Sequence, residues 1–193
     1  MAQQGPIGIN TSRYQVGLMQ IRVTPQSATN IKQSGEILTS SNSIGSLAKT
    51  TVTFEDNILE HKSGYPQLTD AVIRVGRSAS IKCEFDEITR QNIAMALGQN
   101  ISNYTNLSGT VPIGDLSGVN YVRVEGSITY PDGTTTAAII FPRALATIDG
   151  DLAFSQDGFA NASITFKSNI SSSDNSAGDV VWNNNPLGII RFN

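Results

Sequence analysis

Residue types that support chemistry at a protein site are scarce in this chain of 193 residues, which has one cysteine, one histidine and one tryptophan. A single cysteine, Cys83, excludes an internal disulfide, and the apolar neighbour Ile81 indicates a buried structural thiol. A single histidine, His61, excludes an HExxH zinc site. Neither a Gly-x-Ser-x-Gly elbow nor a P-loop occurs. We therefore expect no catalytic residues, no metal and no cofactor.

Charge of either sign is also sparse. Charged residues make up 15% of the chain, and the formal net charge is −3. Binding to nucleic acid phosphates usually needs a basic stripe, which no run of this sequence supplies. The first residues, Met1 to Pro6, have neither a basic start nor an apolar segment, and no apolar run approaches 18 residues. We expect neither a signal peptide nor a membrane span.

Asn, Ser, Thr and Gly are plentiful, and together with 39% hydrophobic residues they favour short strands joined by turns. We predict one domain over 1–193 that is mainly β, a β-sandwich or barrel of about eight strands with one α-helix. The expected strands run over 16–23, 50–54, 71–75, 78–85, 121–130, 135–141, 158–166 and 186–192, with shorter pieces near 37–38 and 152–154.

The single helix is predicted over residues 87–97. Asp86 is a suitable N-cap, and Gly98 suits the position after the last turn. Ile88, Ile93, Ala96 and Leu97 can share one apolar face, with Ile93 and Leu97 four residues apart, so we expect this face to pack against the sheet.

Four segments are expected to lack regular structure: an N-terminal arm at about 1–13, and long loops at 26–48, 55–70 and 168–185. The N-terminal segment 1–13 and the loop 168–185 are too polar to offset the entropy of ordering by burial, so we expect them to become ordered only on assembly. A loop as long as 55–70 often has a function. Its Tyr65 is a residue type favoured at interfaces.

Part of the chain resembles the tail tube proteins of long-tailed bacteriophages. The resemblance is strongest over about residues 50–98. There it rests on Glu60-His61-Lys62-Ser63-Gly64-Tyr65-Pro66, the strands 71–75 and 78–85, and the helical segment 87–98. It is weaker over 121–192, where it rests on Asp157-Gly158-Phe159, Ile164-Thr165-Phe166-Lys167 and Pro186-Leu187-Gly188.

The resemblance implies a structural protein of the virion, assembled in the host cytoplasm. Its copies would form six-membered rings that stack into the tail tube and conduct DNA into the host. The implied partners are further copies of the chain, the tape-measure protein, the tail terminator, baseplate or tail-tip proteins and, in some tails, a sheath protein.

Two groups of residues are candidates for roles in such a tube. Contacts between subunits or rings are expected from the loop 55–70, through Glu55, Asp56, Glu60, His61, Lys62 and Tyr65. An acidic or neutral lumen would let double-stranded DNA pass without binding. Outward-facing acids at Glu125, Asp149 and Asp151 are the candidates for it, although Asp149 and Asp151 also suit a plain turn.

Other functions remain open at this point. A capsid decoration protein and a secretion-system tube protein would share the same general features. A carbohydrate-binding β-sandwich would need an exposed tryptophan or tyrosine beside polar side chains, and Trp182 is the only tryptophan.

Overall fold

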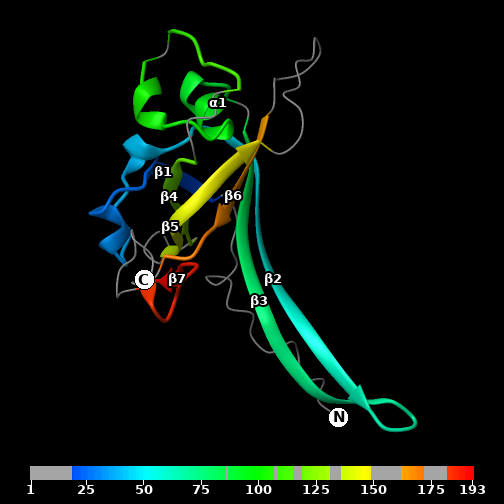
Figure 1. Ribbon diagram of the computed structural model, residues 1–193. Coiled ribbons are helices and arrows are strands. Elements are labelled where there is room, and N and C mark those ends of the chain that lie inside the picture. The colour runs from blue at the N-terminus through cyan, green and yellow to red at the C-terminus, as the bar shows by residue number, and fades with distance from the viewer. Residues whose placement is uncertain are drawn as a thin grey trace, which may run out of the picture.

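A computed structural model describes residues 19–85, 87–106, 108–114, 119–130, 136–148, 162–171 and 182–193. Within them lie seven strands and one α-helix (Figure 1). The strands are β1 (Gln20–Pro25), β2 (Leu47–Ser63), β3 (Leu68–Phe85), β4 (Tyr121–Thr129), β5 (Thr136–Ile148), β6 (Ala162–Ser168) and β7 (Ile189–Phe192). The helix is α1 (Arg90–Ala96), and the 3-10 helices are η2 (Asn30–Lys32), η3 (Ser40–Asn42) and η4 (Ile101–Tyr104).

All seven strands belong to one antiparallel sheet with the order β1-β4-β5-β6-β3-β2, and β7 also pairs with β5. The predicted mainly-β class with a single helix is confirmed. The expected closure into a barrel is wrong for the described residues, because β1 and β2 end the strand order and do not pair with each other. These residues also form one continuous sheet of seven strands, where about eight were expected.

β5 changes partner half-way along its length. Ala137 to Ile140 pair with β7, and Ala144 to Ile148 pair with β6. On its other side, Pro142 and Arg143 stand opposite the single residue Arg123 of β4, which is a bulge. Proline has no N–H to donate to a ladder, so a bulge is where a central strand tolerates it.

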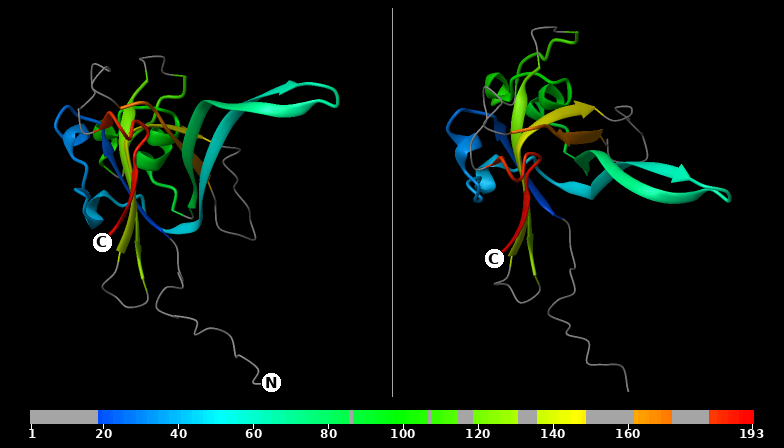
Figure 2. Two further views of the ribbon diagram at one scale, coloured as in Figure 1. Left: turned by 90° about the horizontal axis from the view of Figure 1, so that it is seen from below. Right: turned by 60° about the horizontal axis from the view of Figure 1, so that its bottom comes forward.

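The core draws on both ends of the sheet. Ile21 and Val23 of β1, at one end of the strand order, belong to the same buried cluster as Ile81 and Phe85 of β3, near the other end. One face of the sheet therefore bends round and packs against itself, with Met95 of α1 added to the cluster (Figure 2).

The alternation expected along the end of β3 is confirmed. Ile81, Cys83 and Phe85 are fully buried, whereas Lys82 and Glu84 between them are half-buried. Burial raises the pKa of the Cys83 thiol to about 12, so the thiol stays protonated at neutral pH. Cys83 is a buried structural residue, as expected.

Helix α1 is shorter than predicted and presents a different face to the core. The Thr89 side chain caps its first turn by accepting a hydrogen bond from the N–H of Asn92 at 3.1 Å, while the expected cap, Asp86, lies outside the described residues. Gly98 ends the helix with a φ of +72°, as expected. Asn92, Met95 and Ala96 are buried. The expected packing through Ile93 and Leu97 is wrong, because both are only half-buried.

Two of the expected loops contain regular structure. The separate strands predicted at 71–75 and 78–85 are one strand, β3, and most of the loop predicted at 55–70 is hairpin. The loop at 26–48 contains η2 and η3 and runs into β2, and no strand forms at 37–38. The segments 1–13 and 172–181, and hence most of the loop 168–185, lie outside the described residues.

Met95→Asp should destabilise the subunit far more than Ile93→Asp. A carboxylate at position 95 would be buried without a partner, and we expect a loss of about 3 kcal/mol or more. At position 93 the charge can reach water, and we expect about 1 kcal/mol. Urea denaturation of the two variants measures the difference, and equal losses would show that α1 packs through the Ile93 face.

Candidate functional site

The most unusual feature of the molecule is a long two-stranded arm. β3 pairs with β6 only over Ser80 to Phe85. Its earlier residues, from Leu68 to Ala79, pair with β2 alone. Residues 54–78, which we call the arm, leave the sheet as a curved ribbon (Figures 1 and 2). Every residue from Thr53 to Arg77 is exposed.

Local sequence explains why the arm is a hairpin. β2 ends at Ser63 and β3 begins at Leu68, with Gly64 to Gln67 as the connecting turn. Gly64 has a φ of +85°, a conformation that costs glycine little. The register shifts between Asn57 and Ile58 and again between His61 and Lys62. Such bulges increase twist and bend a strand.

Apolar side chains occupy both faces of the arm. Leu59 pairs with Ile73, and because directly paired residues point to the same side, these two side chains share a face. They are 61% and 62% exposed. Glu60 pairs with Val72, which puts Val72 on the opposite face. The other large exposed apolar residues of the arm are Phe54, Ile58, Tyr65, Leu68 and Val75.

The root of the arm carries an ion-pair cluster. Asp56 accepts hydrogen bonds from Nε and Nη2 of Arg77 at 2.6 and 3.1 Å, and it pairs with Arg74 Nη2 at 3.1 Å. The hydrogen bond from Arg77, followed by the charges of Arg74 and Arg77, lowers the pKa of Asp56. The residues at 74–77 are therefore tied to β2 across the first bulge.

A second polar cluster lies near the tip. Asp70 contacts His61 Nδ1 at 2.6 Å and accepts a hydrogen bond from Ser63 Oγ at 2.5 Å. These hydrogen bonds, the one from Ser63 first, lower the pKa of Asp70. Ser63 bonds to the carboxylate and not to the imidazole, so the three residues do not form the serine–histidine contact that activates a nucleophile.

All six residues predicted to make contacts between subunits lie on the arm and are exposed: Glu55, Asp56, Glu60, His61, Lys62 and Tyr65. Glu55 accepts a hydrogen bond from Ser78 Oγ at 3.2 Å, and Lys62 lies 3.9 Å from Glu60. Their role in assembly stays a prediction. The structure adds the apolar residues between them, which the expectation of a polar loop left out.

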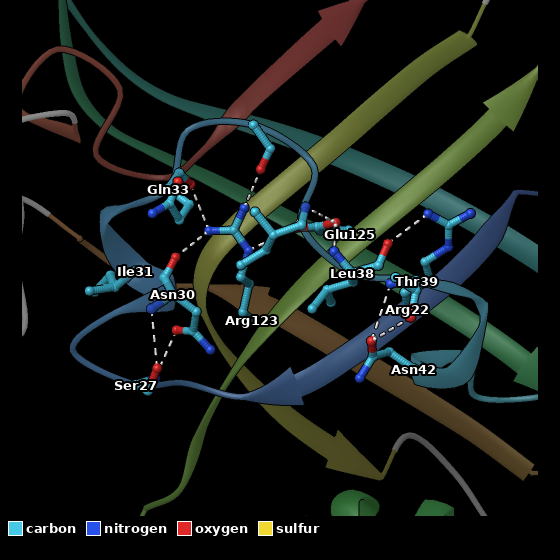
Figure 3. A network of polar contacts seen from close by, with 12 residues as sticks. Arg22, Ser27, Asn30, Ile31, Gln33, Leu38, Thr39, Asn42, Arg123 and Glu125 are labelled. Atoms are coloured by element: carbon cyan, nitrogen blue, oxygen red, sulfur yellow. Dashed lines mark hydrogen bonds and ion pairs between the residues drawn. The ribbon is translucent and has the colours of Figure 1, made fainter.

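A buried ion pair on β4 holds the segment 30–38 against the sheet (Figure 3). Arg123 Nε donates to Glu125 Oε1 at 2.7 Å, and both side chains are fully buried. The remaining Arg123 nitrogens donate to the carbonyls of Asn30, Gln33 and Gly35, each at 2.7 Å. The Glu125 carboxylate accepts from the N–H groups of Ile37 and Leu38 at 3.0–3.1 Å.

This pair corrects the expectation for Glu125. Its side chain is 0% exposed and its oxygens are taken up by Arg123 and the backbone, so it does not face outward as a lumen residue would. A charged carboxylate is stable at this position only because the guanidinium and N–H donors surround it. Asp149 and Asp151, the other lumen candidates, lie outside the described residues.

Three further findings concern a carbohydrate site, a metal site and a membrane span. Trp182 is 0% exposed and donates its indole N–H to the carbonyl of Ile31, so it cannot stack on a sugar. Among the described residues, no three His, Cys, Asp or Glu side chains gather as metal ligands do. In the same part of the chain, no helix has the length and apolar character needed to cross a membrane.

Comparison with known proteins adds little. No family model and no curated protein matches the chain. One solved structure that is similar is a chain of the "Virion of native gene transfer agent (GTA) particle", at 15% identity and a TM-score of 0.38, covering 78% of this chain and 90% of that one. A likeness this weak assigns neither fold nor function.

Glu125→Ala should lower the free energy of unfolding by about 3–5 kcal/mol, because the Arg123 charge stays buried without its carboxylate. The double variant Arg123→Met, Glu125→Ala leaves no buried charge, so it should cost less than the sum of the two single changes Arg123→Met and Glu125→Ala. Urea denaturation of the single and double variants forms the cycle. Additive losses would show that the pair is not coupled.

Proposed function

We propose that this chain is the tail tube protein of a long-tailed bacteriophage, and that its arm joins copies of the chain into the tube. The observation that carries the proposal is the arm: a two-stranded ribbon, solvated on both faces, that displays large apolar side chains. A structural role follows from this feature more directly than any catalytic one, because the groups exposed on the arm are suited to packing.

A free arm of this kind is energetically unfavourable. A lone two-stranded hairpin is at best marginally stable in water. Burying a side chain such as Leu59 or Ile73 stabilises a protein by about 1.5–3 kcal/mol, and the arm leaves that contribution unused. Exposed apolar clusters of this kind mark sites of interaction. The arm therefore fits a protein that functions in an assembly.

Self-assembly is the form of association that the proposal adopts. The sequence resemblance at 50–98 includes both strands of the arm and the helical segment after it, and it implies rings of six copies that stack. The six-fold number, the passage of DNA and the tape-measure, terminator, baseplate or tail-tip and sheath partners are all taken from that resemblance. The proposed location is the virion tail.

Replacing residues 58–75 with Asn-Gly should leave a folded subunit that no longer polymerises. Asn57 and Gly76 are paired, so a two-residue turn can close the shortened hairpin, and the buried part of β3 from Ala79 onward is untouched. Electron microscopy of the purified wild type should show rings or hollow rods, and the shortened protein should remain a folded monomer that keeps α1 and the strands of the body.

Substituting Ile113 with Ser is the matched control, because Ile113 is an exposed apolar residue that lies off the arm. This variant should form rods as the wild type does. Rods formed by the shortened protein would contradict the proposed role of the arm, and a wild type that forms neither rings nor rods at any concentration would contradict the tube itself.

Assembled tubes should not bind double-stranded DNA. A tube must let DNA slide, and each phosphate contact with Lys or Arg would add affinity in every ring. With a net charge of −3 per copy, the assembly carries an excess of acid. Titration of labelled duplex with tubes at low salt should show no saturable binding. Tight binding that weakens steeply with added salt would contradict the proposal.

A further inference from the structure

An apolar pocket of about 190 Å³ lies at the root of the arm. Phe54 and Ala79 line it from the arm side, Ile139 and Phe141 from β5, and Ile189 and Ile190 from β7. We call it the root pocket. β7 pairs with β5 and not with the arm, so the pocket opens between β7 and the root of the arm.

The root pocket is an open end of the hydrophobic core. Ala79 and Phe141 belong to the core cluster and are buried, whereas Phe54 and Ile190 at the mouth are 55% and 49% exposed. An apolar side chain placed between them would cover Phe54 and Ile190 and extend the packing of the core. The volume equals that of roughly six waters in the liquid, which is about the size of one aromatic side chain.

We propose that the root pocket receives the arm tip of a second copy of this chain, with Tyr65 entering the pocket. Tyr65 stands at the turn of the arm and is fully exposed. Tyrosine is among the residues that most often anchor interfaces, and anchors of this type fill pockets. This inference rests on the proposed self-assembly through the arm and names the surface that the arm contacts.

Charge supports the pairing of tip with root. Arg77 lines the pocket, and on its face of the root Arg74 and Arg77 pair with Asp56, which leaves a net charge of +1 in this cluster. The neighbouring Glu55 lies on the opposite face, where it bonds to Ser78. At the tip, which comprises residues 60–70, Glu60 and Asp70 outnumber Lys62, which leaves a net charge of −1 when histidine is counted as neutral. Two tips would repel each other, as would two roots, whereas tip and root attract. The effect is small and screened by salt, so it selects orientation more than it adds affinity.

The geometry of this contact makes it propagate. Tip and root lie at opposite ends of one arm, so a copy that inserts its tip into a neighbour still offers its own pocket to the next copy. Such a head-to-tail contact joins many copies, as a ring where the rotation between neighbours closes and as an open filament where it does not. β3 has twelve residues from Leu68 to Ala79, and at about 3.3 Å per residue they span roughly 40 Å. Successive copies along the arm should therefore repeat at roughly 40 Å or less.

Cross-linking between two variants that each carry one added cysteine tests the contact directly. Tyr65→Cys and Ile190→Cys proteins are mixed as full-length chains under oxidising conditions, at protein concentrations well above about ten times the wild-type assembly threshold, because the cysteine removes the anchoring ring. We expect a disulfide-linked dimer in the mixture and none with either variant alone, because the contact joins different surfaces. The native Cys83 is fully buried and should stay unreactive, which wild-type protein controls.

Ile113→Cys replaces Ile190→Cys in the matched control, since Ile113 is exposed but lies outside the root pocket. No dimer is expected from its mixture with Tyr65→Cys. Absence of the Tyr65–Ile190 cross-link, or equal yield with Ile113→Cys, overturns the inference. Rod formation by the wild type reports on the proposed function separately, so rods without this cross-link would leave the tube standing and reject the root pocket.

The aromatic ring itself is tested by substitution. Tyr65→Ala should raise the protein concentration needed for assembly at least about tenfold, as loss of an interface anchor does. Tyr65→Phe keeps the ring and should stay within about twofold of the wild type. An unchanged threshold for Tyr65→Ala would show that the tip does not fill a pocket.

Discussion

Apolar side chains on both faces of a two-stranded ribbon cannot be buried by the ribbon itself, and this constraint governs the molecule. Another layer of structure would be needed over each face of the arm to bury Leu59, Ile73 and Val72, and the described part of the chain supplies none. The body of the fold is built differently, with a sheet that bends until its own inner face is covered. The body of the protein thus has a buried hydrophobic core, whereas the apolar side chains of the arm are exposed and would be covered in an assembly.

Rigid support at the base of the sheet makes the arm useful. The arm is the outer part of β2 and β3. The inner part of β3 carries Ile81, Cys83 and Phe85, which are fully buried. The Asp56 cluster ties the strands together where the arm leaves the body. Elsewhere, Arg123 and Glu125 hold the long segment 30–38 against β4 through backbone groups, so a stretch with little regular structure stays part of the body.

Local sequence explains which elements could be predicted. The burial of Ile81, Cys83 and Phe85 follows from period-two alternation, and the strands at 121–130 and 135–141 follow from runs rich in β-branched and aromatic residues. The errors came where tertiary contacts decide. Charged residues at 55–62 suggested a loop, yet the same residues form β2 because paired strands accept charges on solvated faces. The expectation of a polar loop overlooked the adjacent apolar run Ala71-Val72-Ile73. Consecutive apolar residues in a strand usually mean that both faces of the strand are covered.

By itself the sequence determined the mainly-β class, the single helix ending at Gly98, the buried thiol and the scarcity of catalytic residue types, because composition and local periodicity act within a few residues. Only the tertiary structure decided that Glu125 is buried, that α1 packs through Met95, and that 55–70 is a projecting hairpin. Each of these depends on a partner far away in the chain: the backbone at 37–38 for Glu125, the shared core for Met95, and the end of β6 for the arm. No local pattern encodes where such partners lie.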